Sequence, residues 1–116
     1  MKSNNKYINF SQGPSIYWSN ATKVSYLQRR VIVHSILYYE LDSPIITDEQ
    51  YNSLSLQLVQ MMKEVSKKEL EETTYWYCMY DFDGSTGFDL FGRLNSKDQH
   101  YLMELSNSIL KLQERR

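Results

Sequence analysis

The segment that decides the fold is residues 38–54, which read Tyr-Tyr-Glu-Leu-Asp-Ser-Pro-Ile-Ile-Thr-Asp-Glu-Gln-Tyr-Asn-Ser-Leu. Pro44 pushes the residue before it out of the helical region, so a helix that reaches this segment must stop there. Thr47 and Gln50 then have the spacing of a capping box, in which each side chain accepts a hydrogen bond from the backbone N–H of the other residue. The segment therefore predicts the end of one helix and the start of another.

Apolar side chains recur at three- and four-residue spacing on both sides of this segment, which is typical of amphipathic helices. The pattern predicts a first helix from about Thr22 to Leu41 and a second helix that continues to Val65. Because a short connection joins the two helices, they are expected to pack as an antiparallel hairpin over residues 22–65. The apolar positions are Val24, Leu27, Val31 and Tyr38 in the first helix and Tyr51, Leu54, Leu58, Met61 and Val65 in the second.

Two further patterns follow the hairpin. Residues 75–80 read Tyr-Trp-Tyr-Cys-Met-Tyr, a composition that favours a strand, and residues 83–87 read Asp-Gly-Ser-Thr-Gly, which is typical of a turn. With residues 88–91 as the returning strand, they predict an aromatic β-hairpin over residues 74–94 that lies on the helices. A second capping-box pattern predicts a C-terminal helix over residues 96–114.

The expected fold class is therefore α+β, mostly helical, with an antiparallel helical hairpin, an aromatic β-hairpin and a C-terminal helix. Residues 1–21 show no clear periodicity and are expected to form an irregular N-terminal arm. The length of 116 residues, with 41% hydrophobic and 23% charged residues, predicts a single soluble domain. No apolar run approaches a membrane span, no secretory signal is evident, and one cysteine is present, which together favour a cytoplasmic location without membrane contact.

Charge is unevenly distributed, although the net charge is only −1. Residues 64–90 contain seven acids and two lysines, a net charge of −5, together with many aromatic side chains. Acids steer association with a basic surface and aromatic residues anchor interfaces, so this stretch predicts a docking surface for a basic protein partner. The alternative is that the aromatic residues form core and the acids are merely solvated. The predicted docking residues are Glu69, Glu71, Glu72, Trp76, Tyr80, Asp81, Phe82, Asp83, Phe88 and Asp89.

No basic stripe is present, which disfavours direct binding of nucleic acid. Residues that catalyse reactions or bind metals are scarce as well: the chain has two histidines and one cysteine, without the spacing of a zinc site. His34 falls on the apolar face of the first helix and is expected to be a core residue. Cys78 lies in an apolar segment that disfavours the thiolate form. We therefore expect no metal site and no enzymatic activity.

The motif in residues 38–54 resembles the N-terminal helical subdomain of NAD-dependent DNA ligases, and the resemblance extends weakly over residues 24–62, about a third of the chain. The matching positions are Tyr38, Tyr39, Asp42, Pro44, Ile46, Asp48, Tyr51 and Leu54. In these ligases the subdomain binds the nicotinamide mononucleotide half of NAD. The resemblance implies that tyrosines stack on the nicotinamide ring while an aspartate binds its polar edge or the ribose. The implied contact residues are Tyr38, Tyr39, Asp48, Tyr51 and Asn52.

Two departures from the ligase pattern bear on activity. The last aspartate of the family motif is Asn52 here, which removes a charge facing the cationic nicotinamide. The adenylation motif Lys-x-Asp-Gly is also absent, because Asp81 stands where its lysine would precede Asp83-Gly84. Without that lysine no nitrogen attacks the phosphorus of NAD, so the chain is not a working ligase. Nicotinamide mononucleotide and NAD are consequently not the favoured cofactors, and the motif has the alternative meaning of a helical hairpin retained for its fold.

The chain as a whole resembles small ligase-related accessory proteins of bacteriophages. That resemblance implies a non-catalytic binding protein that inhibits or occludes a macromolecule of the bacterial host, for example a CRISPR nuclease or another defence nuclease. Two alternatives remain open at this point: a module that binds or sequesters nicotinamide nucleotides, and an accessory factor in nucleic-acid metabolism. The sequence does not fix the oligomeric state.

Overall fold

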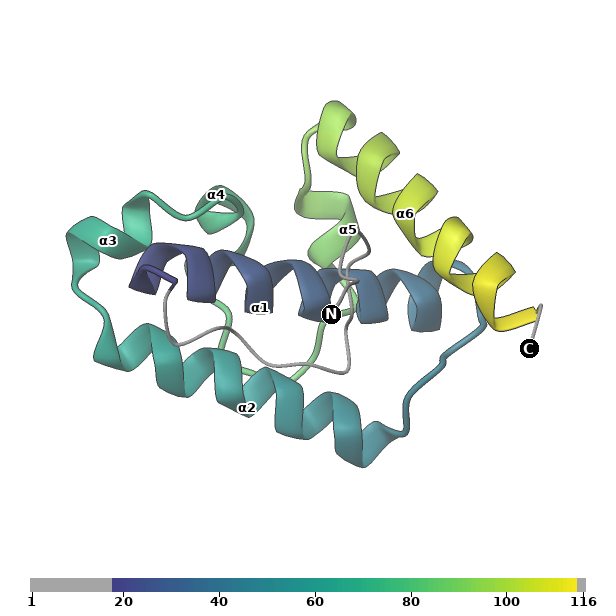
Figure 1. The fold of residues 1–116 in the computed structure, drawn as a ribbon, viewed down its shortest axis with the longest axis horizontal. Helices are drawn as coiled ribbons and strands as arrows, with labels where there is room; N and C mark the ends of the chain where they lie inside the picture. Colours follow the sequence, from purple (N-terminus) through teal and green to yellow (C-terminus); the bar gives the residue numbers. More distant parts are fainter. Residues whose placement is uncertain (1–17, 115–116) are drawn as a thin grey trace, which may run out of the picture.

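The computed structural model describes residues 18–114, and all regular secondary structure within them is helical (Figure 1). Helix α1 (Asn20–Ser35) continues into a π-helical turn, η1 (Ile36–Glu40). Helix α2 (Asp48–Glu64) then runs back alongside α1 in the opposite direction. The expected helical hairpin is therefore present, and its first helix widens in its last turn.

The wide turn ends the first helix and turns two tyrosines outward. The Leu41 N–H donates to the Ile36 carbonyl at 2.9 Å, and the Ser43 N–H donates to the Leu37 carbonyl at 2.7 Å. Asp42 completes the turn with a φ of 49°, in the left-handed region that short polar residues tolerate better than others. Ile36 and Leu37 remain in the core, whereas the next two residues, Tyr38 and Tyr39, are exposed.

The start of α2 confirms the capping box. The Thr47 hydroxyl accepts from the Gln50 N–H at 3.1 Å, and the Gln50 side-chain oxygen accepts from the Thr47 N–H at 2.8 Å. These two bonds satisfy backbone donors that have no partner inside the helix. Asp48 and Glu49 occupy the first turn, where the positive end of the helix dipole stabilises carboxylates.

The prediction of an aromatic β-hairpin over residues 74–94 is wrong. This region contains the short helices α4 (Trp76–Met79) and α5 (Leu90–Arg93), and the described residues include no strand. A strand buries alternate residues, but the neighbours Cys78 and Met79 are both fully buried. Burial of one helical face therefore overrode the strand preference of the aromatic residues. The buried positions, at helical spacing, are Tyr75, Cys78, Met79 and Phe82.

The turn predicted between the two segments is correct. The Asp83 carboxylate accepts from the Ser85 N–H at 2.9 Å and from the Ser85 hydroxyl at 2.7 Å, which is an Asx-type turn. Gly84 has a φ of 87°, a conformation that glycine adopts without steric cost. The turn carries the chain from α4 across the hairpin, so residues 85–87 come to lie near the start of α2.

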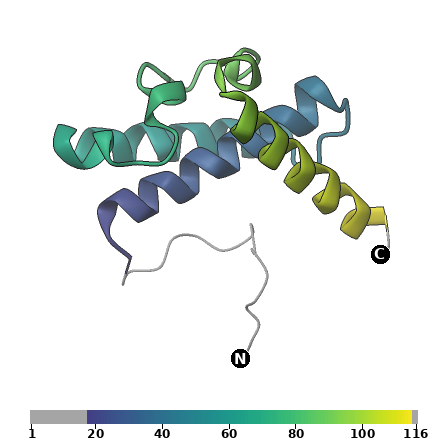
Figure 2. The ribbon, with the colours of Figure 1, turned by 90° about the horizontal axis from the view of Figure 1, so that it is seen from above.

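The remaining helices complete the core around α1. Helix α3 (Lys67–Glu71) follows α2, and the expected C-terminal helix α6 (Ser96–Glu114) crosses the end of α1 (Figures 1 and 2). The capping box expected at Ser96 and Gln99 is wrong, because the Asn95 side chain accepts from the Asp98 N–H at 2.8 Å instead. Of the predicted N-terminal arm, residues 1–17 lie outside the described part. Among residues 18–114, no helix has the length and apolarity that a membrane span requires. Fully buried side chains from five segments meet in the core, including Leu27, Val31, Leu58, Met79, Leu90 and Leu102.

Candidate functional site

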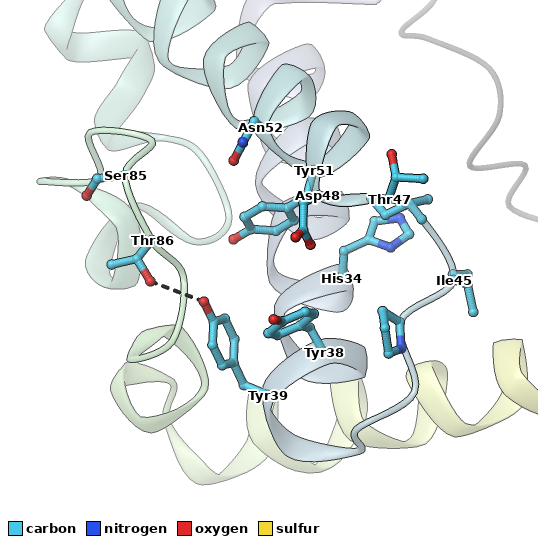
Figure 3. Close-up of a pocket in the computed structure, with 12 residues that line it drawn as sticks. His34, Tyr38, Tyr39, Ile45, Thr47, Asp48, Tyr51, Asn52, Ser85 and Thr86 are labelled. Carbon is cyan, nitrogen blue, oxygen red and sulfur yellow. Dashed lines mark hydrogen bonds between the residues drawn. The ribbon is translucent and has the colours of Figure 1, made fainter.

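A cavity of about 230 Å³ lies where the hairpin connection meets the 83–87 turn. Three segments form its wall: the end of α1 with η1, the connection and first turns of α2, and the turn itself (Figure 3). All five residues that the ligase resemblance implies line this one cavity. The lining residues are His34, Tyr38, Tyr39, Pro44, Ile45, Ile46, Thr47, Asp48, Tyr51, Asn52, Ser85 and Thr86.

Two tyrosines from the π-helical turn form the aromatic wall. The rings of Tyr38 and Tyr39 pack edge to face, with centroids 4.7 Å apart and planes at 70°. The two side chains are 46% and 44% exposed, so ring surface remains accessible to a ligand. The Tyr39 hydroxyl bonds the Thr86 hydroxyl at 3.3 Å, which ties this wall to the turn (Figure 3).

Tyr51 closes the cavity on the core side. Ser35 uses its only hydroxyl hydrogen on the Val31 carbonyl at 2.9 Å, so the Tyr51 O–H donates to the Ser35 oxygen at 2.8 Å. Burial raises the pKa of Tyr51, against a smaller lowering by the Ser35 bond, and the phenol stays neutral. Tyr51 therefore offers a fixed, uncharged aromatic surface.

Gly87 lets the 83–87 turn pack against the hairpin, and no pattern in the sequence predicted this contact. A β-carbon at Gly87 would overlap both the Tyr51 hydroxyl and the Ser35 hydroxyl. Only glycine lets the turn approach this hydrogen-bonded pair, and that approach brings Ser85 and Thr86 to the cavity. The turn-type sequence at residues 83–87 indicated a glycine, but nothing in it indicated the contact with α1 and α2.

The polar groups of the cavity come mainly from the first turns of α2. Asp48 and Asn52 are four residues apart on that helix, so they share one face, and both are exposed. Asp48 supplies a carboxylate beside Tyr51, while Asn52 supplies an amide that both donates and accepts (Figure 3). The site thus combines aromatic surface with one negative charge.

His34 is a core residue, as the sequence predicted, although it also lines the cavity. Its side chain is only 4% exposed. Burial lowers the pKa of His34 to about 4, and the nearby positive charge of Arg30 contributes to the shift. The imidazole is therefore neutral at pH 7 and adds no charge to the site.

The predicted docking residues do not behave as one set. Phe82 is buried in the core, so its prediction as a docking residue is wrong. The Arg93 guanidinium donates to both Asp81 oxygens, at 2.8 and 3.1 Å, and holds the pKa of that carboxyl below its usual range. Asp83 is occupied by its turn bonds to Ser85, and Glu69 accepts from the Ser66 hydroxyl at 3.0 Å. The other docking residues are exposed or half-buried: Glu71, Glu72, Trp76, Tyr80, Phe88 and Asp89.

Nucleophilic and metal chemistry find little support among the described residues. Burial raises the pKa of Cys78 to about 11, and its thiol donates to the Leu90 carbonyl at 3.5 Å. No group of three His, Cys, Asp or Glu side chains within residues 18–114 is placed to hold a metal ion. Comparison with protein-family models, with curated proteins and with solved structures found no match.

Proposed function

We propose that this chain is a non-catalytic protein that binds a nicotinamide nucleotide in the cavity between η1, α2 and the 83–87 turn. One observation carries the proposal. The five side chains selected by resemblance alone, which come from two helical segments of the hairpin, line a single cavity. A motif retained only as a helix stop and start would not require its polar and aromatic positions to face a common hollow.

The chemistry of the cavity suits a nicotinamide ring. Tyr38 and Tyr39 expose ring surface on which a planar ligand stacks. Nicotinamide is cationic in its oxidised nucleotides, and the Asp48 carboxylate offsets that charge. The Asn52 amide matches a carboxamide, because each group both donates and accepts hydrogen bonds. The replacement of the ligase aspartate by Asn52 therefore removes a charge and leaves hydrogen bonding in place.

The volume of the cavity suits a single nicotinamide ring. Pockets that enclose drug-sized ligands measure roughly 300–1,000 Å³, whereas this cavity holds about 230 Å³. A nicotinamide ring fits within it, and the rest of the nucleotide extends beyond it. Since the chain lacks the adenylation lysine, it would hold the nucleotide without transferring it, and its role would be sequestration or sensing.

Isothermal calorimetry with nicotinamide mononucleotide tests the proposal. We expect micromolar binding by the unaltered chain and roughly tenfold weaker binding by Tyr38→Ala, the usual cost of a lost ring stack. Asp48→Asn should also weaken binding. The matched control is Tyr101→Ala, because Tyr101 on α6 is 48% exposed and Tyr38 is 46% exposed. Adenosine monophosphate, which shares ribose and phosphate, should bind poorly. Absence of binding, or equal weakening by the control, would refute the proposal.

The second candidate function is occlusion of a basic host protein, such as a defence nuclease. The observation in its favour is the exposure of two large aromatic side chains in the acidic stretch, 63% for Phe88 and 55% for Tyr80. Such residues anchor interfaces when a partner buries them. Inhibition of a purified nuclease that is lost in Phe88→Ala with Tyr80→Ala, but kept in Tyr101→Ala, would support it. Loss through Tyr38→Ala instead would assign the activity to the cavity.

A further inference from the structure

The charge of the cavity depends on one side chain. Among the described residues that line it, Asp48 is the only acid, and none is a lysine or an arginine. Figure 3 shows the Asp48 carboxylate directed toward the ring of Tyr38. His34 adds no positive charge, because burial lowers its pKa to about 4. The wall formed by these residues is therefore negative at pH 7, and Asp48 carries the charge.

The segments that form the wall extend this negative charge beyond the lining residues. Residues 34–52 and 83–87 contain five acids and no lysine or arginine. Hydrogen bonds from the Ser85 hydroxyl and N–H hold the pKa of Asp83 below its usual range, so this carboxylate is also ionised at neutral pH. A ligand that enters the cavity therefore meets a negative potential, and these segments supply no cation to oppose it. The five acids are Glu40, Asp42, Asp48, Glu49 and Asp83.

Several polar groups of the wall can only accept hydrogen bonds from a ligand. Ser85 donates its only hydroxyl hydrogen to Asp83 at 2.7 Å, and Tyr51 donates its own to Ser35 at 2.8 Å. Each hydroxyl oxygen then has only lone pairs to offer, and the Asp48 carboxylate is an acceptor as well. The neutral Asn52 amide supplies a donor. The wall thus suits a neutral group that donates and accepts, and it opposes a group that carries negative charge.

We propose, on the basis of the proposed function, that Asp48 makes the cavity selective for nicotinamide nucleotides over nicotinic acid nucleotides. The two ligands share the cationic ring, the ribose and the phosphate, and they differ only in a carboxamide or a carboxylate on the ring. The carboxamide NH2 donates to the acceptors of the wall, and its oxygen accepts from Asn52. The carboxylate donates nothing, and Asp48 repels it because like charges facing each other are unfavourable. The chain thereby distinguishes the amide form of the ligand from the acid form.

Calorimetry with two probes, nicotinamide mononucleotide and nicotinic acid mononucleotide, measures this selectivity. The unaltered chain should bind the amide form roughly tenfold more tightly, since Asp48 is exposed and solvent screens part of its repulsion. Asp48→Asn keeps the shape of the side chain and removes its charge, so it should weaken binding of the amide form and strengthen binding of the acid form. Damage to the fold would weaken both. Added salt should also bring the two affinities of the unaltered chain closer together.

Glu49→Gln is the matched control. It removes the same charge from the same turn of α2, at a residue that does not line the cavity, so the ratio of the two affinities should stay nearly unchanged. Equal affinity of the unaltered chain for both probes would overturn the selectivity while the proposed function stands. A ratio that survives Asp48→Asn, or that changes as much in Glu49→Gln, would overturn the role of Asp48. If neither probe binds, the proposed function and the selectivity fail together.

Discussion

Helices α2 and α4 show two different ways of fixing a helix in this molecule. Helix α2 begins with the reciprocal hydrogen bonds of Thr47 and Gln50, which are local and lie at the surface. Helix α4 is only four residues long and begins at Tyr75 without any side-chain cap. It is held instead because Cys78 and Met79 are fully buried in the core. Local hydrogen bonds thus set the start of α2, and tertiary packing sets α4.

The difference explains why the two regions respond differently to change. A lost cap removes one or two hydrogen bonds that water partly replaces, which costs little. A lost core side chain removes apolar contact and leaves a cavity, which costs several times more. A short segment without a cap therefore takes whichever conformation buries its apolar side chains, regardless of its intrinsic preference.

The largest effect is expected where packing alone holds the helix. Met79→Ala should lower the free energy of unfolding by about 2–5 kcal/mol, the range for deletion of a buried methionine side chain. Denaturant unfolding measures this cost. The matched control is Met62→Ala on α2, where the side chain is only partly buried and should cost much less. Equal effects at the two positions would contradict the packing of α4 against the core.

A comparable effect should follow from protonation of His34, which is buried near the end of α1. The pKa of His34 is about 4 in the folded chain and about 6.5 in an unfolded one, so the unfolded state binds the proton first as pH falls. Stability should be unaffected by this group above about pH 6.5 and should decrease by about 3 kcal/mol as pH falls to about 4.

The measurement is the free energy of unfolding as a function of pH. His34→Gln should remove the decrease over that window, whereas His100→Gln should leave it unchanged, because the His100 side chain is 79% exposed. A decrease that persists in His34→Gln would assign the pH dependence to other groups.

The contact between the turn and the hairpin should show an intermediate effect. Gly87→Ala forces a β-carbon against the Tyr51 and Ser35 hydroxyls, and overpacking of this kind costs about 1–3 kcal/mol. Combining it with Tyr51→Phe should restore part of the loss, because that change removes one of the two overlapping hydroxyls. Gly92→Ala is the control, since a β-carbon there meets nothing within 4 Å. Equal losses of melting temperature in Gly87→Ala and Gly92→Ala would refute the contact.

The smallest effect belongs to the local cap. Thr47→Ala removes the hydroxyl that accepts from Gln50 and should cost about 1 kcal/mol, the usual size of a lost N-cap. The cost should appear as a lower denaturant midpoint with an unchanged slope. Thr47→Ser, which keeps the hydroxyl, should remain close to the unaltered chain. A cost for Thr47→Ala as large as that of Met79→Ala would remove the distinction between the two helices.

The site was predictable as far as it lies on one continuous motif. Tyr38, Tyr39, Asp48, Tyr51 and Asn52 stand close together in the sequence, and a stop followed by a cap fixes how the two helical segments face each other. No comparable signal in the sequence marked Ser85, Thr86 or Gly87 as part of the site. Ser85 and Thr86 reach the cavity through the path of the turn, which no local pattern specifies.

The strand prediction failed for an identifiable reason. Aromatic composition at residues 75–80 expresses a local preference of at most about 1 kcal/mol per residue. The spacing of Tyr75, Cys78, Met79 and Phe82 matches one face of a helix, and it was the better signal in the sequence. The composition of this segment indicates only that it contains many apolar residues. The spacing of those residues indicates which of them can be buried on one face.

By itself the sequence determined the hairpin, its connection, the cap of α2 and the C-terminal helix, because each depends on hydrogen bonds and backbone restrictions within a few residues. Only the tertiary structure decided the conformation of residues 75–91 and the meeting of the turn with Tyr51. Those outcomes depend on contacts between distant segments, where the burial of a whole apolar face outweighs the preference of any single residue.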